Sequence, residues 1–161
     1  MPDPSAVEAL LTPSTRALVI INPNNPTGAV YSRDCLTRLA EIAEANDLVV
    51  LSDEIYDQMV YEDAEFVPMA TLCPNALCAT FSGLSKVYRA CGYRVGWVAF
   101  SGALDRSDDF LRAMDLLAAL RLCSNVPGQW AVQTALGGHQ SIRKLCSKGG
   151  RLHESREAVL K

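Results

Sequence analysis

Several familiar sequence signals are missing from this chain, and each absence excludes a class of protein. No apolar run approaches the roughly 20 residues that a membrane-spanning helix needs, and no charged leader followed by an apolar stretch opens the chain. The charge is nearly balanced, with 15 basic against 18 acidic side chains and a net charge of -3, so no basic surface for nucleic acid is indicated. We therefore expect a cytoplasmic protein that binds neither membranes nor nucleic acids.

The common fingerprints of nucleotide and metal sites are absent as well. The sequence contains neither Gly-x-Gly-x-x-Gly nor a Walker loop, so nothing in it predicts a dinucleotide or a nucleoside triphosphate. Its six cysteines are scattered without Cys-x-x-Cys spacing or nearby histidines, which favours reduced thiols in the core over a zinc site. Neither His139 nor His153 has ligand-like partners in the sequence, and we expect no metal.

What the chain does contain is a composition typical of globular proteins, 49% hydrophobic and 20% charged, and a regular alternation of two patterns. Four short apolar runs predict β-strands, at residues 17–21, 48–51, 76–81 and 95–100. Five further segments have the apolar spacing or the end signals of helices, starting near Asp3-Pro4, Ser32, Asp105, Pro127 and Arg151. The first of these combines Pro4 with a Ser5-x-x-Glu8 capping box.

Strands that alternate with helices predict an α/β fold, with a mostly parallel sheet of four strands and helices on both faces. The uninterrupted run at 17–21 indicates a strand covered on both faces, and the short connection before 95–100 leaves room for an antiparallel last strand. In such sheets ligands bind beyond the carboxyl ends of the strands. Polar side chains gather at those ends: Asn24, Asn25, Asp53, Tyr56, Ser82, Ser85 and Lys86. The pattern predicts one ligand-binding crevice there.

Lys86 is the candidate with the most specific chemistry. It comes just past a predicted buried strand, and a buried ammonium is costly unless its charge is paired or its pKa falls. An amine held in this way is suited to imine chemistry. Taken alone, Lys86 is better read as an ordinary loop lysine, and Asp53 as a turn or helix-cap carboxylate. Arg94 has two possible roles, binding a phosphate or pairing with a surface acid.

Together, these groups suit pyridoxal 5'-phosphate. That cofactor needs a lysine that forms an imine, an anion beside its pyridinium nitrogen, donors to its 3'-oxygen, and cationic or hydroxyl anchors for its phosphate. An amine, a carboxylate, two amides, a phenol, hydroxyls and an arginine all occur in the loops that follow the predicted strands. The combination therefore predicts a pyridoxal-phosphate site.

Three stretches of the chain carry a resemblance to a known family. They are Asn22-Pro-Asn-Asn-Pro-Thr-Gly28, Ser52-Asp-Glu-Ile-Tyr56 and Ser82-Gly-Leu-Ser-Lys-Val-Tyr-Arg-Ala-Cys-Gly-Tyr-Arg-Val-Gly-Trp97. In this order they resemble the signature blocks of fold-type I pyridoxal-phosphate aminotransferases, and the similarity covers essentially the whole chain. Finer detail, in Tyr88-Arg89 and Arg121-Leu-Cys-Ser-Asn-Val-Pro127, is similar to bacterial alanine aminotransferases.

The resemblance implies a role for each candidate residue. Lys86 would hold the cofactor as an imine and then carry the proton between the substrate α-carbon and the cofactor's C4'. Asp53 would pair with the pyridinium nitrogen, and Arg94 would bind the phosphate. Asn25 and Tyr56 would donate to the 3'-oxygen, which stabilises its anionic form and lowers the pKa of the imine.

One phosphate anchor departs from the family pattern. The family's second phosphate hydroxyl usually lies three residues before the lysine, where this chain has Gly83. Ser82, one residue further back, and Ser85, next to the lysine, are the remaining candidates. The resemblance also implies a cis peptide bond between Asn25 and Pro26.

The resemblance further implies the substrates and the extent of the parent protein. The parent is expected to be a homodimer that moves an amino group between an amino acid, such as alanine, and a 2-oxo acid. Because family members are longer, residues 1–150 are expected to form the central part of the cofactor-binding large domain, and residues 151–161 the start of a linker helix to a small domain. That small domain carries the arginine for the substrate carboxylate, so the fragment alone is expected to be inactive.

Three other interpretations stay open. A carbon-sulfur lyase or synthase of the same fold would use the same cofactor and the same lysine. A non-catalytic cofactor-binding fragment, such as the sensor domain of a transcription regulator, would keep the site, although nothing basic or helix-turn-helix-like precedes Asp3. A plain α/β binding module would have no cofactor on Lys86.

Overall fold

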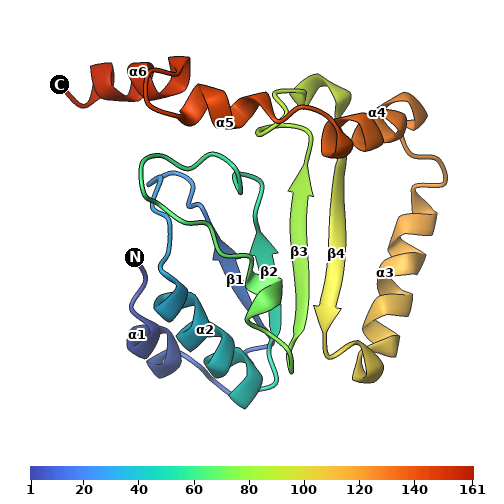
Figure 1. Ribbon diagram of the computed structural model, residues 1–161. Helices are drawn as coiled ribbons and strands as arrows, with labels where there is room; N and C mark the ends of the chain where they lie inside the picture. Colours follow the sequence, from blue (N-terminus) through green and yellow to red (C-terminus); the bar gives the residue numbers. More distant parts are fainter.

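A computed structural model describes residues 1–161, and its centre is one four-stranded sheet (Figure 1). The strands β1 (Ala17–Ile21), β2 (Val49–Asp53), β3 (Leu77–Gly83) and β4 (Gly96–Gly102) lie side by side in chain order. The first three are parallel, and β4 runs antiparallel to β3. The predicted α/β fold with an antiparallel last strand is thus confirmed.

Six helices accompany the sheet: α1 (Pro4–Ala9), α2 (Arg33–Ala45), α3 (Asp108–Leu120), α4 (Val126–Gly137), α5 (Ser141–Cys146) and α6 (Arg151–Val159). Three short 3-10 turns lie between them, η1 (Met69–Thr71), η2 (Cys91–Tyr93) and η3 (Leu104–Arg106). Every helix except α5 is predicted by the sequence. The short α5 has no side-chain cap at Gln140, so the signal that would have predicted it is missing. No helix is both long and apolar enough to cross a bilayer.

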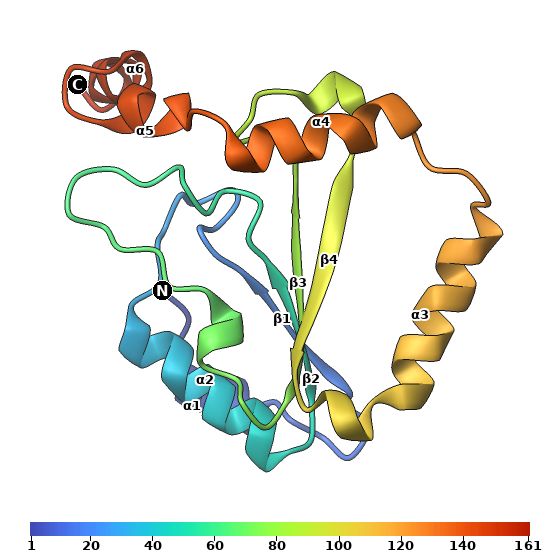
Figure 2. The same cartoon turned by 45° about the vertical axis from the view of Figure 1, so that its right-hand side comes forward.

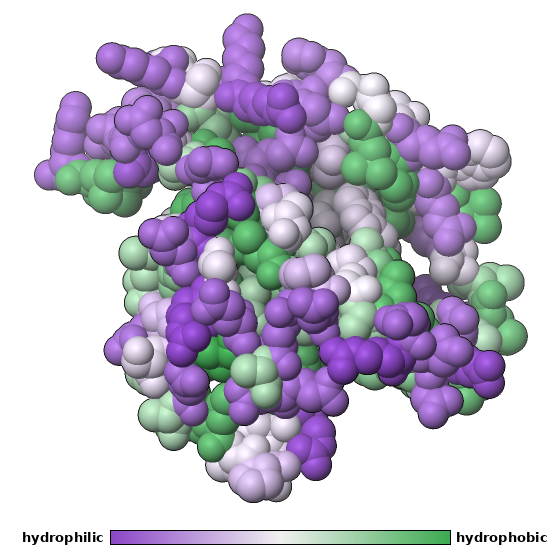
Figure 3. Space-filling model, turned by 60° about the horizontal axis from the view of Figure 1, so that its bottom comes forward, coloured by the Kyte–Doolittle hydropathy of each residue, from purple (hydrophilic) through white to green (hydrophobic).

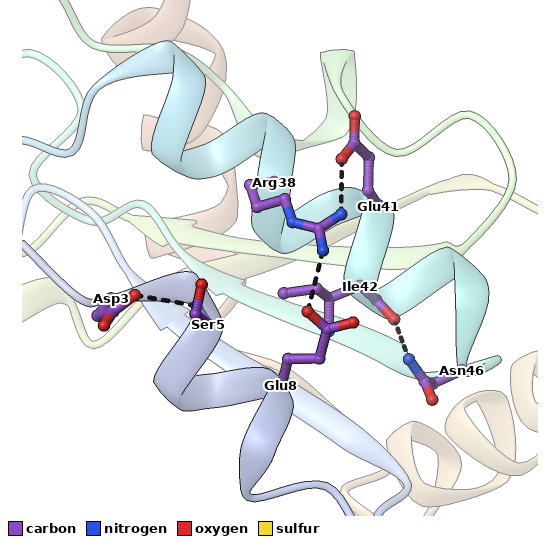
Figure 4. A network of polar contacts seen from close by, with 7 residues as sticks. All are labelled: Asp3, Ser5, Glu8, Arg38, Glu41, Ile42 and Asn46. Atoms are coloured by element: carbon purple, nitrogen blue, oxygen red, sulfur yellow. Dashed lines mark hydrogen bonds and ion pairs between the residues drawn. The ribbon is translucent and has the colours of Figure 1, made fainter.

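The two N-terminal helices begin at side-chain caps, and Figure 4 shows the cap of α1. Asp3 accepts a hydrogen bond from the backbone N–H of Ser5 at 3.0 Å and so caps α1. The predicted Ser5-x-x-Glu8 capping box is therefore wrong, because Asp3 already occupies the cap position. Glu8 instead pairs with Arg38 of α2 at 2.9 Å and ties the two helices together. Ser32 caps α2, as predicted.

The core lies between the sheet and the pair α1 and α2. The apolar side of α2 and alternate positions of β1, β2 and β3 form one buried cluster, which includes Ile20, Leu36, Leu39, Val50 and Cys78. Because side chains alternate along a strand, the residues between these positions face the other side of the sheet. The covered face is therefore the one that includes Val50 and Ser52.

The opposite face is only partly covered. Figure 2 shows α3 on the side of the sheet away from α1 and α2. It meets β4 where the rings of Phe100 and Phe110 pack edge to face, 6.1 Å between centroids. Val19 of β1 is 64% exposed and Phe81 of β3 is 36% exposed. The prediction that both faces of residues 17–21 are covered is wrong for this chain, because no helix lies over β1 on this side.

Apolar side chains also reach the surface elsewhere (Figure 3). The helix α3 has no buried residue, and Leu116, Leu117 and Leu120 on it are exposed. Trp130 on α4 is exposed too. Figure 1 shows α4, α5 and α6 in a row along the top of the molecule, with α4 above β3 and β4, so these helices lie on the side of the carboxyl ends of β1, β2 and β3.

Candidate active site

Three parallel strands end level at one edge of the sheet. The register pairs Ile21 with Asp53 and Asp53 with Phe81. Backbone hydrogen bonds continue the ladder just beyond the strands, from Asn22 N–H to the Asp53 carbonyl at 3.1 Å and from Glu54 N–H to the Phe81 carbonyl at 2.9 Å. The loops after β1, β2 and β3 therefore leave from neighbouring points.

The loop after β1 is held by its own asparagines. Asn22 is buried, and its side-chain oxygen accepts from the Tyr31 N–H at 2.8 Å. The Asn24 oxygen accepts from the Thr27 hydroxyl at 2.7 Å. Asn25 is exposed and its amide makes no hydrogen bond within the chain, so it is free to donate to a ligand. The Asn25-Pro26 peptide bond is cis, as the resemblance implied, and so is the bond that follows Asn22.

The loop after β2 presents a carboxylate. Asp53 is half-buried and lies on the sheet face opposite to Val50 and Ser52. Its Oδ1 accepts from the Ile55 N–H at 3.1 Å, which fixes the carboxyl group at the start of the turn. The second carboxylate oxygen has no partner in the chain and is available to a ligand.

The loop after β3 presents Lys86 on a turn. Leu84 N–H donates to the Val95 carbonyl at 3.0 Å, and Arg89 N–H donates to the Lys86 carbonyl at 2.9 Å. The Lys86 side chain is exposed and has no acid partner, and its Nζ lies 5.8 Å from the centroid of the Tyr56 ring. The Lys86 ammonium is thus not buried in this chain, because the turn projects from the open edge of the sheet.

The phosphate candidates are less closely grouped. Arg94 is exposed, has a positive φ of 52°, and donates from Nη1 to the Cys91 carbonyl at 2.8 Å without a carboxylate partner. Ser85 is half-buried beside Lys86. Ser82 lies on the face of β3 away from Asp53 and lines a separate pocket of 340 Å³. The structure therefore separates Ser82 from the Asp53 side of the sheet.

A glycine stands where the family usually has a hydroxyl, and the backbone explains why. A Cβ added to Gly83 would lie 2.8 Å from the Val95 carbonyl oxygen and 3.1 Å from the Cα of Gly96. The two strands β3 and β4 approach each other too closely there for a side chain. A serine at this position would force the antiparallel pair apart.

A pocket of 490 Å³ lies beside Asn25 and Tyr56. Of the polar residues predicted at the strand ends, Asn24, Asn25 and Tyr56 line it, and the others lie outside this pocket. Its far wall contains Glu62 and Arg156, where the Arg156 Nη1 pairs with Glu62 Oε1 at 3.2 Å. No local pattern could predict that pair, because 94 residues separate its members.

A buried acid, Glu54, and a half-buried acid, Asp57, flank the site. Glu54 is 6% exposed, and burial raises its pKa, while hydrogen bonds from the Met69 N–H and the Ser52 hydroxyl lower it and the nearby carboxylates raise it further. Burial also raises the pKa of Asp57, which the Gln58 N–H and the charge of Arg143 lower. Sequence reasoning passed over both residues, since burial of an acid leaves no local pattern.

One cluster contradicts the expectation that the histidines have no ligand-like partners. Glu62, His153 and Glu157 place their ligand atoms within 4.8 Å of one another. Arg156, however, already pairs with both carboxylates, at 3.2 Å to Glu62 and 2.8 Å to Glu157. The two carboxylates therefore share one guanidinium within the protein.

The comparison with known sequences identifies the class of protein that has this fold and these loops. The family Aminotransferase class I and II matches residues 2–161. The chain belongs to this family. Pyridoxal phosphate is the cofactor that the family implies, in agreement with the prediction from the strand-end residues.

The most similar relatives include particular transaminases. The chain is 51% identical to the alanine aminotransferase of Mycobacterium tuberculosis over 156 residues, which are 97% of the chain and 36% of the relative. It is 50% identical to the glutamate-pyruvate aminotransferase AlaA of Escherichia coli over 155 residues, which are 96% of the chain and 38% of the relative. The chain thus spans little more than a third of the relatives that it matches.

Solved structures give the same relationship in three dimensions. An aminotransferase from Escherichia coli superposes with a TM-score of 0.95 at 49% identity, covering 98% of the chain and 39% of that structure. The alanine aminotransferase from Pyrococcus furiosus superposes with a TM-score of 0.84 at 38% identity, covering 89% of the chain and 38% of that structure. The fold is that of part of an aminotransferase.

The residues present fit the cofactor. Lys86 offers an amine without an acid partner, and Asn25 offers an amide without any partner in the chain. Asp53 keeps one carboxylate oxygen free, and Arg94 keeps its guanidinium free of any carboxylate. These are the donor and acceptor types that the pyridine ring, its 3'-oxygen, its aldehyde and its phosphate require. Each of these side chains keeps at least one polar atom without a partner in the chain, so it is available to the cofactor.

Proposed function

We propose that the protein to which this chain belongs is a pyridoxal-phosphate-dependent aminotransferase that moves an amino group between alanine, or a similar amino acid, and a 2-oxo acid. The observation that carries the proposal is the family match over residues 2–161. It is supported by sequence identities of 51% and 50% to an alanine aminotransferase and a glutamate-pyruvate aminotransferase. The loops at the strand ends supply the chemical groups that this reaction needs.

Lys86 is the proposed catalytic residue. Its Nζ binds the cofactor covalently and afterwards moves the proton of the substrate α-carbon, which requires a free amine on a turn that can reach both positions. The exposed side chain and the lack of an acid partner meet this requirement. When bound, pyridoxal phosphate supplies the electron sink for the carbanion at the substrate α-carbon.

The other residues hold and tune the cofactor. The free carboxylate oxygen of Asp53 keeps the ring nitrogen protonated. Asn25 and Tyr56, which line one pocket, donate to the 3'-oxygen. Arg94 binds the phosphate through its fork, with Ser85 as the hydroxyl closest to the lysine in the sequence. Ser82 is the weakest of the proposed ligands, because it faces the other side of the sheet.

The parent protein is proposed to be a cytoplasmic homodimer. Residues 1–150 belong to the cofactor-binding large domain, and residues 151–161 begin the helix that leads to a small domain. The share of the relatives that this chain spans, 36% and 38%, supports a parent protein that is longer than this chain. The exposed Val19 and Phe81 support it as well, since they leave sheet surface for further chain or a second subunit to cover.

Two experiments test the proposal. In the first, the chain is mixed with pyridoxal phosphate and reduced with borohydride, and the added mass is located by peptide mapping. Modification at Lys86 supports the proposal, and modification spread over the other lysines contradicts it. In the second, the full-length protein is given L-alanine and 2-oxoglutarate. Formation of pyruvate with glutamate supports transamination, whereas a protein that leaves L-alanine unchanged but converts L-cysteine into pyruvate, ammonia and sulfide is a carbon-sulfur lyase.

A further inference from the structure

Glu54 is the one acidic side chain that the fold buries. The chain has 18 acidic residues, and Glu54 is the only one among its buried residues. Its Oε1 accepts a hydrogen bond from the Ser52 hydroxyl at 3.0 Å and another from the backbone N–H of Met69 at 2.9 Å. Both donors are neutral, and no lysine, arginine or histidine pairs with the carboxylate.

A carboxylate in this place is costly for the fold. Burying a charged group without a cation is unfavourable, and apolar side chains of similar size often replace buried charges without loss of stability. The charges that act on its pKa are those of Asp57 and Asp53, which have the same sign and oppose ionisation. Packing alone therefore does not explain a glutamate here. The reason must lie in what its oxygen holds in place.

What Glu54 holds is the loop that presents Tyr56. The bond from Met69 N–H closes residues 54–68 into one loop, because Met69 begins η1, which packs on β3. The same loop lines the pocket of 490 Å³ with Met59, Val60, Tyr61, Glu62 and Ala64. The bond from the Ser52 hydroxyl reaches back to the residue before Asp53. One carboxyl group thus joins strand, turn and loop.

Backbone hydrogen bonds also hold the turn that contains Glu54. Its N–H donates to the Phe81 carbonyl at 2.9 Å, and its carbonyl accepts from the Asp57 N–H at 3.0 Å. Ile55 N–H donates to Asp53 Oδ1 at 3.1 Å. Asp53 and Tyr56 therefore stand on the two sides of a turn whose orientation relative to η1 depends on the Glu54 side chain.

We propose that Glu54 is a positioning residue that fixes the Asp53 carboxylate and the Tyr56 phenol relative to each other for the cofactor. It does not touch the cofactor and acts through the turn at 53–56. This role rests on the proposed function, since it assigns Glu54 to the site that Asp53 and Tyr56 form.

The first test uses the cofactor-free chain. Glu54→Leu removes the acceptor at similar size, and Glu54→Gln keeps an oxygen acceptor. Glu65→Leu is the control, since Glu65 lies in the same loop with its side chain 80% exposed. Hydrogen exchange at the Ile55, Asp57 and Met69 amides should quicken by about tenfold or more in E54L, and should be nearly unchanged in E54Q and E65L. Unchanged exchange in E54L would overturn the proposal.

The second test measures the dissociation constant for pyridoxal phosphate by equilibrium dialysis. E54L should bind about tenfold more weakly than the wild type, while E54Q should bind within about threefold of it. Asp53→Asn should weaken binding less in the E54L background than in the wild type, because Glu54 acts through Asp53. Additive effects of the two substitutions would mean that Glu54 has a structural role only and would refute the positioning role.

These outcomes keep the two proposals apart. If the wild-type chain and the full-length protein both fail to bind pyridoxal phosphate, the proposed function fails, and hydrogen exchange alone then decides whether Glu54 holds the turn. If the wild type binds and E54L binds equally well, the proposed function stands and the positioning role of Glu54 fails.

Discussion

The ammonium nitrogen of Lys86 lies 5.8 Å from the centroid of the Tyr56 ring, so the loops after β2 and β3 meet through their side chains. This distance places the proposed catalytic amine next to a proposed ligand of the 3'-oxygen. An aromatic face attracts a cation within about 6 Å, so the ring also favours this position of the free ammonium. The relationship joins two sequence blocks that are 30 residues apart and leads to the first two predictions.

Replacing Lys86 by alanine should abolish covalent attachment of the cofactor. The amine is the only group of the site that forms an imine with an aldehyde, and the turn that carries it is held by backbone bonds that alanine leaves intact. The measurement is the mass of the borohydride-reduced protein. Lys148→Ala is the control, since Lys148 is exposed and distant in the sequence from the site. A stable adduct of unchanged yield in K86A would refute the assignment.

Replacing Tyr56 by phenylalanine should raise the pH at which the absorbance of the bound cofactor changes. The phenol stabilises the anionic 3'-oxygen, and losing a hydrogen bond to a charged group is worth about one to two pKa units. The pH titration is followed by absorbance on the reconstituted protein. Tyr31→Phe is the control, because Tyr31 packs against the core cluster instead of the pocket. An identical titration of Y56F and the wild type would exclude Tyr56 as the donor.

Replacing Gly83 by serine, which restores the family's usual hydroxyl, should destabilise the protein by about 1–3 kcal/mol. The new Cβ would lie 2.8 Å from the Val95 carbonyl, so the pair β3 and β4 must shift. Gly92→Ser is the matched control, since a Cβ on Gly92 meets no atom within 4 Å, and its effect should stay within about 0.5 kcal/mol. Urea unfolding measures both. A fully stable G83S would show that the strands adapt.

Replacing Glu54 by glutamine should change how stability depends on pH. Burial raises the pKa of Glu54 above its ordinary value of 4.5, so the folded protein favours the protonated acid. Below the ordinary pKa the acid is protonated in both the folded and the unfolded protein, and the folded protein is at its most stable with respect to Glu54. This stability is lost as the pH rises through the raised pKa of the folded protein. Glutamine does not titrate. The free energy of unfolding of E54Q should therefore rise relative to that of the wild type between about pH 4 and pH 7.

Urea unfolding at several pH values tests this prediction. Asp57→Asn is the comparison, because burial raises the pKa of Asp57 as well and its removal should act in the same direction. Glu65→Gln is the control with an exposed side chain. A difference between E54Q and the wild type that does not vary with pH would contradict a raised pKa at Glu54.

Local signals predicted much of the fold. The run at residues 17–21 coincides with β1, and the cap at Ser32 with the start of α2. These elements follow from periodicity and capping, which act within a few residues. The same local rule explains why Asp3 and not Ser5 caps α1. A single side chain that can accept a hydrogen bond from the first turn is enough to start the helix. The unpredicted α5 has no such cap.

The site was predicted as a set of residues, but its geometry was not. Lys86 is exposed on its turn, and Ser82 faces the side of the sheet away from Asp53. Both depend on how the strands end and which face of the sheet is covered. Arg156 and Glu62 meet across the pocket from positions 94 residues apart. Such contacts depend on the path of the whole chain.

The sequence by itself predicted the class of the protein and the residues proposed for its site, because strand periodicity and residue types at strand ends are local properties. Only the tertiary structure decided which groups meet. It placed the Lys86 ammonium over the Tyr56 ring and left no room for a side chain at Gly83. It also buried Glu54, the residue that follows Asp53. Each of these three features depends on contacts between segments that are far apart in the sequence. Such segments come together only when the sheet has formed.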